Sequence, residues 1–302
     1  MICCETEIGG KCKRAILDPV LLNDKRVLDN LFATEDKYLP DARYFNCVQT
    51  DIQPYMRKMV TEWMAEVCSE QKMEEGVFPL SVNYLDRFLC IRDIKRTKLQ
   101  LLGAACMFLA SKLKESTPIT GEQLVMYTDH SITLDDLTEM ESLIITLLNW
   151  DLLAIVPNDF LDHVLHRMPL VSRIQFPIIK RHAQTFAALC ATDCKFMQTP
   201  PSMIACCSIA SAIKALKGDS TEDIFHLHVI TGIDMDMIRA CVEQVEQTVK
   251  TYMAAYIQSN PHTPTKQDPQ KQEQPSTPTD VREINILAVD NSQVHHAVPV
   301  TM

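Results

Sequence analysis

The chain has 302 residues, of which 46% are hydrophobic, and it contains only 7 glycines. This length allows two domains, and so few glycines are unusual for a sheet protein, which needs many turns. The formal net charge is −10 and no basic run stands out, which argues against a nucleic-acid-binding protein. The composition therefore favours a folded, helix-rich protein.

The cysteines and the apolar segments indicate a reduced, intracellular protein without a membrane anchor. The sequence has 12 cysteines, but most lie inside helical patterns, and the first residues lack the apolar stretch of a signal peptide. No Cys-x-x-Cys pair occurs, and close histidine pairs such as His226 and His228 lack further ligands, so we expect no metal and no cofactor. The most apolar windows, Leu99–Ser111 and Ser202–Ile213, are too short to cross a bilayer.

Apolar periodicity predicts helices along the first half of the chain. After an irregular lead-in over residues 1–20, a helix is expected to begin after Asn23 or Asp24, to cover Val27–Phe32 and to end before Pro40. Apolar residues at helical spacing then predict five helices, at Met56–Val67, Pro79–Phe88, Leu99–Lys114, Thr120–Tyr127 and Asp135–Leu148.

The same pattern recurs in the second half. Prolines again stand near helix starts, where a missing N–H costs little. The five helices expected here are Phe160–Leu165, Arg173–Cys194, Ser202–Leu216, Glu222–Ile230 and Asp234–Ile257. The predicted fold is all-α, with two tandem five-helix repeats at residues 21–152 and 153–258 behind an N-terminal helix.

An internal repeat is visible when the two most apolar helices are aligned at an offset of 100 residues. In this alignment Ala105, Cys106, Ala110 and Ser111 meet Ala205, Cys206, Ala210 and Ser211. Chance similarity between two helices of small residues is the alternative. A central helix can have close neighbours on every side only if its side chains are short, so we interpret both segments as central helices.

The composition changes at the end of the chain. Residues 259–302 contain six prolines and five glutamines with few large apolar side chains. Such a segment cannot bury enough apolar surface to offset the entropy of ordering. We expect a disordered regulatory tail.

Several long sequence segments occur in a fixed order along the chain. They are Asp51-Ile52-Gln53-Pro54-Tyr55, Met56-Arg57-Lys58-Met59-Val60-Thr61-Glu62-Trp63, Asn83-Tyr84-Leu85-Asp86-Arg87-Phe88, Leu99–Gly103, Phe108–Glu115, Ala191–Asp193, Pro200–Met203 and Thr277–Arg282. Together these segments resemble the cyclins, and D-type cyclins in particular. The resemblance implies a non-catalytic subunit that binds and activates a cyclin-dependent kinase of the four/six class, presents substrates at the G1/S transition and resides in nucleus and cytoplasm.

Two charged residues stand out within apolar helices. Lys112 interrupts the first central helix, where its repeat counterpart is Ala212, and Glu141 lies on the polar side of a helix rich in leucine and isoleucine. The residues alone favour solvated edge positions. The resemblance implies instead that Lys112 and Glu141 bind the kinase, with flanking contacts from Leu113, Lys114, Phe78 and Leu148.

A methionine-rich stripe runs along the preceding helix, through Met56, Met59, Val60 and Trp63. Its periodicity alone favours a core position. The resemblance implies an exposed groove that captures Arg-x-Leu segments of substrates and kinase inhibitors, a role that suits the adaptable methionine side chain. In that groove Gln100 is the hydrogen-bonding group and Glu66 is the acid for the arginine.

Both ends of the chain carry segments to which the resemblance gives a role. Met1-Ile2-Cys3-Cys4-Glu5 is similar to the Leu-x-Cys-x-Glu motif that docks retinoblastoma-family proteins, with Met1 in place of leucine; a frayed terminus is the alternative. Thr277, followed by proline, is similar to the phosphorylated degradation signal that a ubiquitin ligase reads, and Thr263 is a second candidate. Family members usually end shortly after this signal, whereas this chain continues to Met302.

Other functions remain as alternatives. A cyclin-fold transcription-initiation factor would also stack two five-helix repeats, but it should show a basic face and often a zinc ribbon, and neither is visible. A divergent cyclin that escapes regulation is the other alternative, and the presence of Thr277 in the tail is only weak evidence against it. An enzyme is not expected, since the sequence has no Gly-rich phosphate loop and no supported nucleophile or metal set.

Overall fold

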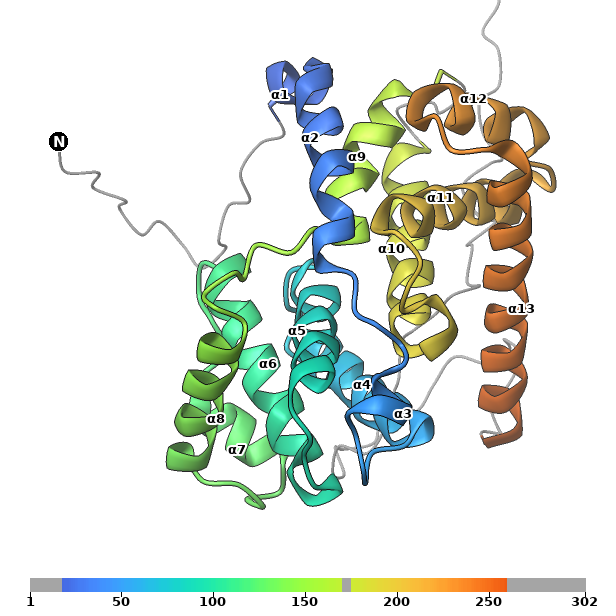
Figure 1. The fold of residues 1–302 in the computed structure, drawn as a ribbon. Helices are drawn as coiled ribbons and strands as arrows, with labels where there is room; N and C mark the ends of the chain where they lie inside the picture. Colours follow the sequence, from blue (N-terminus) through green and yellow to red (C-terminus); the bar gives the residue numbers. More distant parts are fainter. Residues whose placement is uncertain (1–17, 170–174, 260–302) are drawn as a thin grey trace, which may run out of the picture.

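The computed structural model describes residues 18–169 and 175–259, and every regular element in these ranges is a helix (Figure 1). The predicted tail and most of the predicted lead-in lie outside the described residues. The first helices are α1 Pro19–Asn23, α2 Lys25–Glu35 and α3 Tyr44–Cys47. The first bundle consists of α4 Pro54–Glu70, α5 Val77–Ile91, α6 Leu99–Lys114, α7 Gly121–Tyr127 and α8 Leu134–Leu147. The second consists of α9 Pro157–Arg167, α10 Phe176–Thr192, α11 Pro201–Lys217, α12 Thr221–Thr231 and α13 Met235–Ser259.

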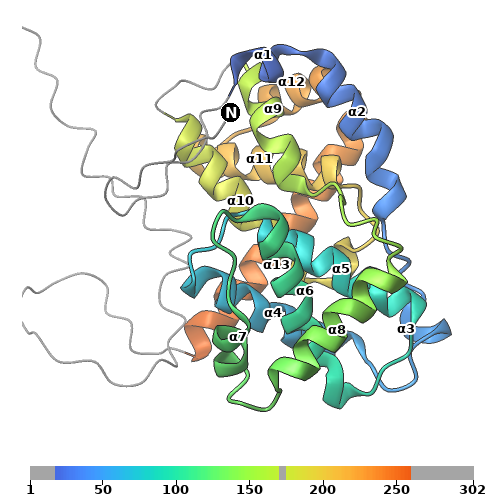
Figure 2. The same ribbon diagram turned by 90° about the vertical axis from the view of Figure 1, so that its left-hand side faces the viewer.

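The two bundles, α4–α8 and α9–α13, are stacked on one another, and each has its own hydrophobic core (Figure 2). Helix α6 is central in the first bundle because it packs on α4, α5, α7 and α8, and α11 holds the same place among α9, α10, α12 and α13. The aligned small residues are buried in both helices, for example Ala110 and Ala210. Short side chains allow this close packing, and the two-repeat, all-α fold predicted from sequence is confirmed.

Gly103 sets the distance between α6 and α4. A Cβ atom at this position would lie 3.0 Å from Cγ2 of Val60 and 3.2 Å from Sδ of Met64. Both contacts are tighter than ordinary van der Waals packing, so even an alanine here would require the side chains of Val60 and Met64 to shift by a few tenths of an ångström. The position of α4 relative to α6 matters because these helices carry both interaction surfaces described below.

The N-terminal helix α2 is attached to the second bundle. Leu28 belongs to the second core, and Glu35, at the other end of α2, reaches the start of α11. Oε2 of Glu35 accepts a hydrogen bond from the backbone N–H of Ser202, and Oε1 accepts one from its hydroxyl, both at 2.7 Å. The carboxylate thereby satisfies an N–H that has no partner within the helix and complements the helix dipole.

Replacing Glu35 with alanine is expected to lower the free energy of unfolding by about 1–3 kcal/mol, because buried donors of Ser202 lose their acceptor. Urea denaturation measures the effect, and an unchanged stability would contradict the capping role. Burial raises the pKa of Glu35, although hydrogen bonds from Ser202 act in the opposite direction. Wild-type stability should therefore fall relative to Glu35→Gln as the pH rises from the ordinary carboxyl value through the raised folded-state pKa.

The observed helix boundaries differ from the predicted ones by up to three residues at both ends; α4, for example, ends at Glu70 instead of Val67. Helix α10 begins at Phe176 instead of Arg173, which places Pro177 in the first turn, where a proline needs no partner. Helix α5 begins at Val77, before Pro79, for the same reason. The short helices α1 and α3 were not predicted, because neither is long enough to show an apolar period.

Candidate interaction surfaces

Lys112 and Glu141 meet at the edge of the first bundle, where α6 packs against α8. Nζ of Lys112 lies 2.7 Å from Oε1 and 2.8 Å from Oε2 of Glu141, and 3.7 Å from the centroid of the Phe108 ring, a cation–π contact. The side chains of Lys112 and Glu141 are 40% and 13% exposed. Because the repeat counterpart Ala212 is fully buried, the packing of the repeat does not require a lysine at this position.

The four flanking residues predicted to contact a kinase divide into exposed and buried ones. The side chain of Leu113 is 45% exposed, and Nζ of Lys114 lies 3.4 Å from Oδ1 of Asp159 on α9, so Lys114 links the two bundles. Phe78 and Leu148 belong to the first hydrophobic core and present little surface. The accessible part of the predicted site is therefore the charged pair together with Leu113 and Lys114.

A cavity of about 390 Å³ lies beside Leu113, between α2, α5, α6 and α9. Its apolar lining includes Val27, Leu31, Leu80, Leu113, Leu152 and Leu153. Leu153 is 77% exposed, so apolar surface continues from the cavity to the outside of the molecule. Sites that combine an apolar hollow with a few polar groups are typical binding sites, and this one can hold an apolar side chain of a partner.

The predicted Arg-x-Leu groove lies on α4 and the start of α6. Met59 is 63% exposed, whereas Val60 is buried in the first core. The other predicted residues are half-buried or exposed, namely Met56, Trp63, Glu66 and Gln100. The methionine-rich stripe is thus divided: Val60 belongs to the core, and Met59 lies on the surface with the polar residues beside it.

Two carboxylates lie next to this stripe, one turn apart on α4. Partial burial and the neighbouring Glu62 raise the pKa of Glu66. The exposed pair between Nζ of Lys58 and Glu62, at 3.8 Å, contributes little to stability. A partly desolvated carboxylate beside a second one gains from binding a cation, and arginine can pair with a carboxylate through two hydrogen bonds.

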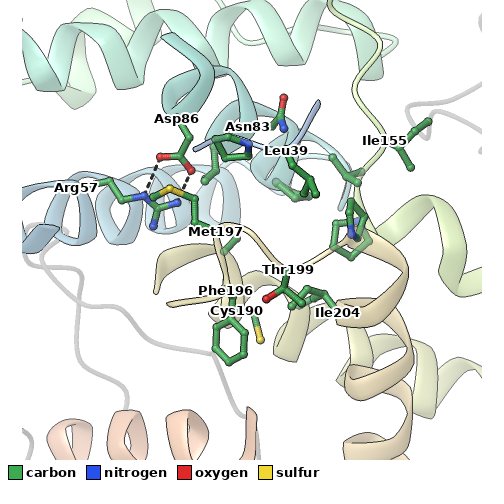
Figure 3. Close-up of a pocket in the computed structure, with 18 residues that line it drawn as sticks. Leu39, Arg57, Asn83, Asp86, Ile155, Cys190, Phe196, Met197, Thr199 and Ile204 are labelled. Atoms are coloured by element: carbon green, nitrogen blue, oxygen red, sulfur yellow. Dashed lines mark hydrogen bonds and ion pairs between the residues drawn. The ribbon is translucent and has the colours of Figure 1, made fainter. Parts of the chain in front are cut away.

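The buried side of α4 carries an ion pair to which no role was assigned from the sequence (Figure 3). Nε and Nη2 of Arg57 donate to the two carboxylate oxygens of Asp86 at 3.0 and 2.7 Å, and Nη1 donates to the backbone carbonyl of Thr192 at 2.9 Å. The hydroxyl of Tyr44 donates to Asp86 at 3.1 Å. The arginine therefore links α4 and α5 of the first bundle to the end of α10 in the second.

The electrostatics of this pair follow from its burial. The side chains of Arg57 and Asp86 are 1% and 3% exposed. Burial alone would lower the pKa of Arg57, but the charge and hydrogen bonds of Asp86 outweigh it and raise the pKa above its ordinary value. Burial, with the Asp86 charge, raises the pKa of Tyr44. Arg57 and Tyr44 therefore keep their protons near neutral pH and remain hydrogen-bond donors to Asp86.

The remaining sequence predictions concern the two ends of the chain and the cysteines. Met1, Cys3, Glu5, Thr263 and Thr277 lie outside the described residues. The cysteines that the structure describes are free thiols, most of them buried. Burial raises the pKa of two thiols to about 12, which disfavours the reactive thiolate at neutral pH; they are Cys68 and Cys206.

Within residues 18–169 and 175–259, no group of three His, Cys, Asp or Glu side chains is placed to hold a metal ion. No helix in the described part of the chain has the length and apolar content needed to cross a membrane.

Known proteins resemble this chain over nearly its full length. The family model "Cyclin, N-terminal domain" matches residues 26–153, and "Cyclin, C-terminal domain" matches residues 155–277. G1/S-specific cyclin-D2 of Gallus gallus is 48% identical over 295 residues, which cover 95% of this chain and 99% of that relative. G1/S-specific cyclin-D1 of Danio rerio and cyclin-D3 of Homo sapiens are each 46% identical, over 293 and 296 residues, with the same coverage.

A solved structure shares the fold. The X-ray structure of a viral cyclin from herpesvirus saimiri aligns with a TM-score of 0.69 and 26% sequence identity. The alignment covers 74% of this chain and 97% of that one. The two stacked bundles described above are therefore the arrangement of a known helical fold.

Proposed function

The chain belongs to the D-type cyclin family, and we propose that it binds its kinase through the Lys112–Glu141 pair, Leu113 and the adjoining cavity. As a member of this family it is a non-catalytic regulatory subunit of a cyclin-dependent kinase in the G1/S transition. The four/six class is the kinase class that we propose, from the resemblance to D-type cyclins. The family membership leaves no reason to retain a transcription-initiation factor as the alternative.

The proposed mechanism is a shift in the conformation of the kinase. A kinase is active only when its strand lysine pairs with the glutamate of its αC helix. A subunit that binds this arrangement and not the inactive one shifts the equilibrium by its differential affinity. Lys112 donates to acceptors on the kinase, Glu141 accepts from donors, and the cavity receives an apolar side chain. The observation that carries the proposal is the charged pair, held at an edge where the second repeat buries an alanine.

Complex formation tests the proposed kinase partner. The purified chain and a cyclin-dependent kinase of the four/six class should elute from a sizing column as one complex, and that complex should phosphorylate a retinoblastoma-protein fragment faster than the kinase alone. Failure to form a complex with any cyclin-dependent kinase would overturn the assignment of this surface.

We also propose that the exposed face of α4 docks Arg-x-Leu segments of substrates and kinase inhibitors. Three features support this: Met59 is exposed, Trp63 is half-buried beside it, and Glu66 provides a partly buried acid for the arginine. The apolar part would bind the leucine and the residue after it. Gln100, at the start of α6, would hydrogen-bond the peptide backbone.

Replacing Met59 with aspartate is expected to weaken the binding of an Arg-x-Leu peptide about ten-fold or more, since a buried apolar contact of this size is worth about 1.5–3 kcal/mol. Fluorescence anisotropy with a labelled peptide measures the change. The side chain of Met59 is 63% exposed, so the fold and kinase binding should persist. Met237→Asp is the matched control, because Met237 is 60% exposed on α13 and should leave peptide affinity unchanged; equal losses in both variants would contradict the assignment.

The two ends of the chain supply further proposed partners, which rest on the resemblance to D-type cyclins alone. The Met1-x-Cys3-x-Glu5 segment would dock retinoblastoma-family proteins. Phosphorylated Thr277 would be read by a ubiquitin ligase, because the phosphate adds charge and strong acceptors to the tail. Export and turnover triggered in this way would divide the protein between nucleus and cytoplasm.

A further inference from the structure

The exposed face of α4 combines apolar side chains with acid. Tyr55 and Met59 are 60% and 63% exposed, and Trp63 is half-buried between them and the core. Glu62 and Glu66 follow about one and two turns after Met59 on the same face. Exposed apolar residues rimmed by charge mark an interaction site. The matching ligand is an extended segment in which a cation adjoins large apolar side chains.

The tail of this same chain contains such a segment. Between residues 260 and 302, Arg282 is the only arginine, and it is preceded by Val281 and followed by Ile284, Ile286 and Leu287. Residues 260–280 contain no large apolar side chain. The triplet that begins at Arg282 differs from Arg-x-Leu only in having isoleucine at its last position. The arginine and the large apolar side chains therefore occur together in one segment of the tail, Val281–Leu287.

The path of the chain allows this segment to reach α4. Helices α4 and α13 both pack against α10, and the C-terminal end of α13 lies in the same half of the molecule as α4 (Figures 1 and 2). Residues 260–280 connect Ser259 to the segment, which begins at Val281. A connection of this length spans up to roughly 75 Å when extended and about 25 Å as a flexible coil. The tether is therefore long enough for docking within one molecule.

We propose that residues 281–287 dock onto the exposed face of α4 of the same chain, with Arg282 paired to Glu66 and the apolar residues against Met59 and Trp63. This inference rests on the proposed role of that face as an Arg-x-Leu groove, and it adds a built-in competitor for the groove. A tether of this kind gives an effective concentration on the order of 1 mM. Even a weak segment then competes, and only tighter ligands displace it.

Release of the tail provides the first test. In the full-length chain bound to its kinase, Arg282→Ala combined with Ile284→Ser should raise the affinity for a fluorescein-labelled Arg-x-Leu peptide about 3- to 10-fold, as expected for removal of a competitor at millimolar effective concentration. Lys271→Ser is the matched control, because it removes a tail cation outside the segment and should leave the affinity unchanged.

The outcomes separate this inference from the proposed groove. If the peptide binds wild type and the double variant equally, docking of the tail is overturned and the groove stands. If it binds neither, the groove and the inference both fail. If Lys271→Ser raises the affinity as much as the double variant, the effect comes from tail charge in general and docking of the segment is overturned.

A second measurement locates the segment without using peptide affinity. A photoreactive benzophenone side chain placed at position 286 of the full-length chain should cross-link to residues 54–70 within one molecule, as read by mass spectrometry at low protein concentration. Cross-links confined to other helices would overturn the inference. Cross-links between two copies, at the mass of a dimer, would also overturn it and assign the groove a second chain as its occupant.

Discussion

Replacing Arg57 with alanine is expected to lower the free energy of unfolding by about 3–5 kcal/mol, because removal of one partner leaves the other charge buried and uncompensated. The remaining carboxylate of Asp86 would keep only the hydroxyl of Tyr44 as a donor within 3.1 Å. In the variant, the backbone carbonyl of Thr192, at the junction between the bundles, would also lose the hydrogen bond that it accepts from Arg57. Urea denaturation, followed by circular dichroism, measures the loss.

The size of this effect depends on burial, and two further variants test that dependence. Arg43 forms an equally short pair with Asp41, at 2.6 Å, but its side chain is 80% exposed, so Arg43→Ala should cost only about 0–1 kcal/mol. The double variant Arg57→Ala, Asp86→Ala should be more stable than Arg57→Ala alone, because it removes the orphaned charge. A double variant that is less stable than Arg57→Ala would show that packing, and not charge, dominates at this site.

The helices could be predicted because each buries a face with a clear period. The stripe of α4 is a local pattern, and the repeat of small residues in α6 and α11, offset by 100 residues, can be seen in the sequence itself. Ala110 and Ala210, which the repeat aligns, are both buried. Helix boundaries were less predictable than the helices themselves. A proline is tolerated at several positions of the first turn, and Pro79 and Pro177 both come after the first residue of their helix. Attachment of α2 through Glu35 could not be predicted, because it joins residues far apart in sequence.

The candidate site was only partly predictable for a similar reason. A stripe of period 3.6 does not separate a core residue from a surface one at its border, and Val60 and Met59 fall on opposite sides of that border. The burial of Arg57 is visible in the sequence. Arg57, Val60 and Met64 have i, i+3 and i+7 spacing, which places the arginine on the buried face of the helix. A charge in such a register must find a partner, and Asp86 is that partner.

Lys112→Glu is expected to abolish activation of the kinase while the chain stays folded. The substitution removes the hydrogen-bond donor that we propose for the kinase. It also places a second carboxylate next to Glu141, whose Oε1 lies 2.7 Å from Nζ of Lys112 in the wild type. Truncating one member of a charge pair that is buried in an interface costs about 2–5 kcal/mol, which corresponds to a loss in affinity of about 30-fold to several thousand-fold. Calorimetry with the purified kinase measures it.

The second repeat offers a matched control for this variant. Nζ of Lys214 on α11 lies 2.7 Å from Glu246, and its side chain is 42% exposed, against 40% for Lys112. Lys214→Glu therefore introduces the same like-charge contact at similar exposure, but on the other bundle. Its kinase affinity should equal that of wild type, and the stabilities of the two variants should be similar. Equal losses of affinity would attribute the effect to net charge or fold, whereas full kinase activation by Lys112→Glu would move the kinase-binding surface away from α6.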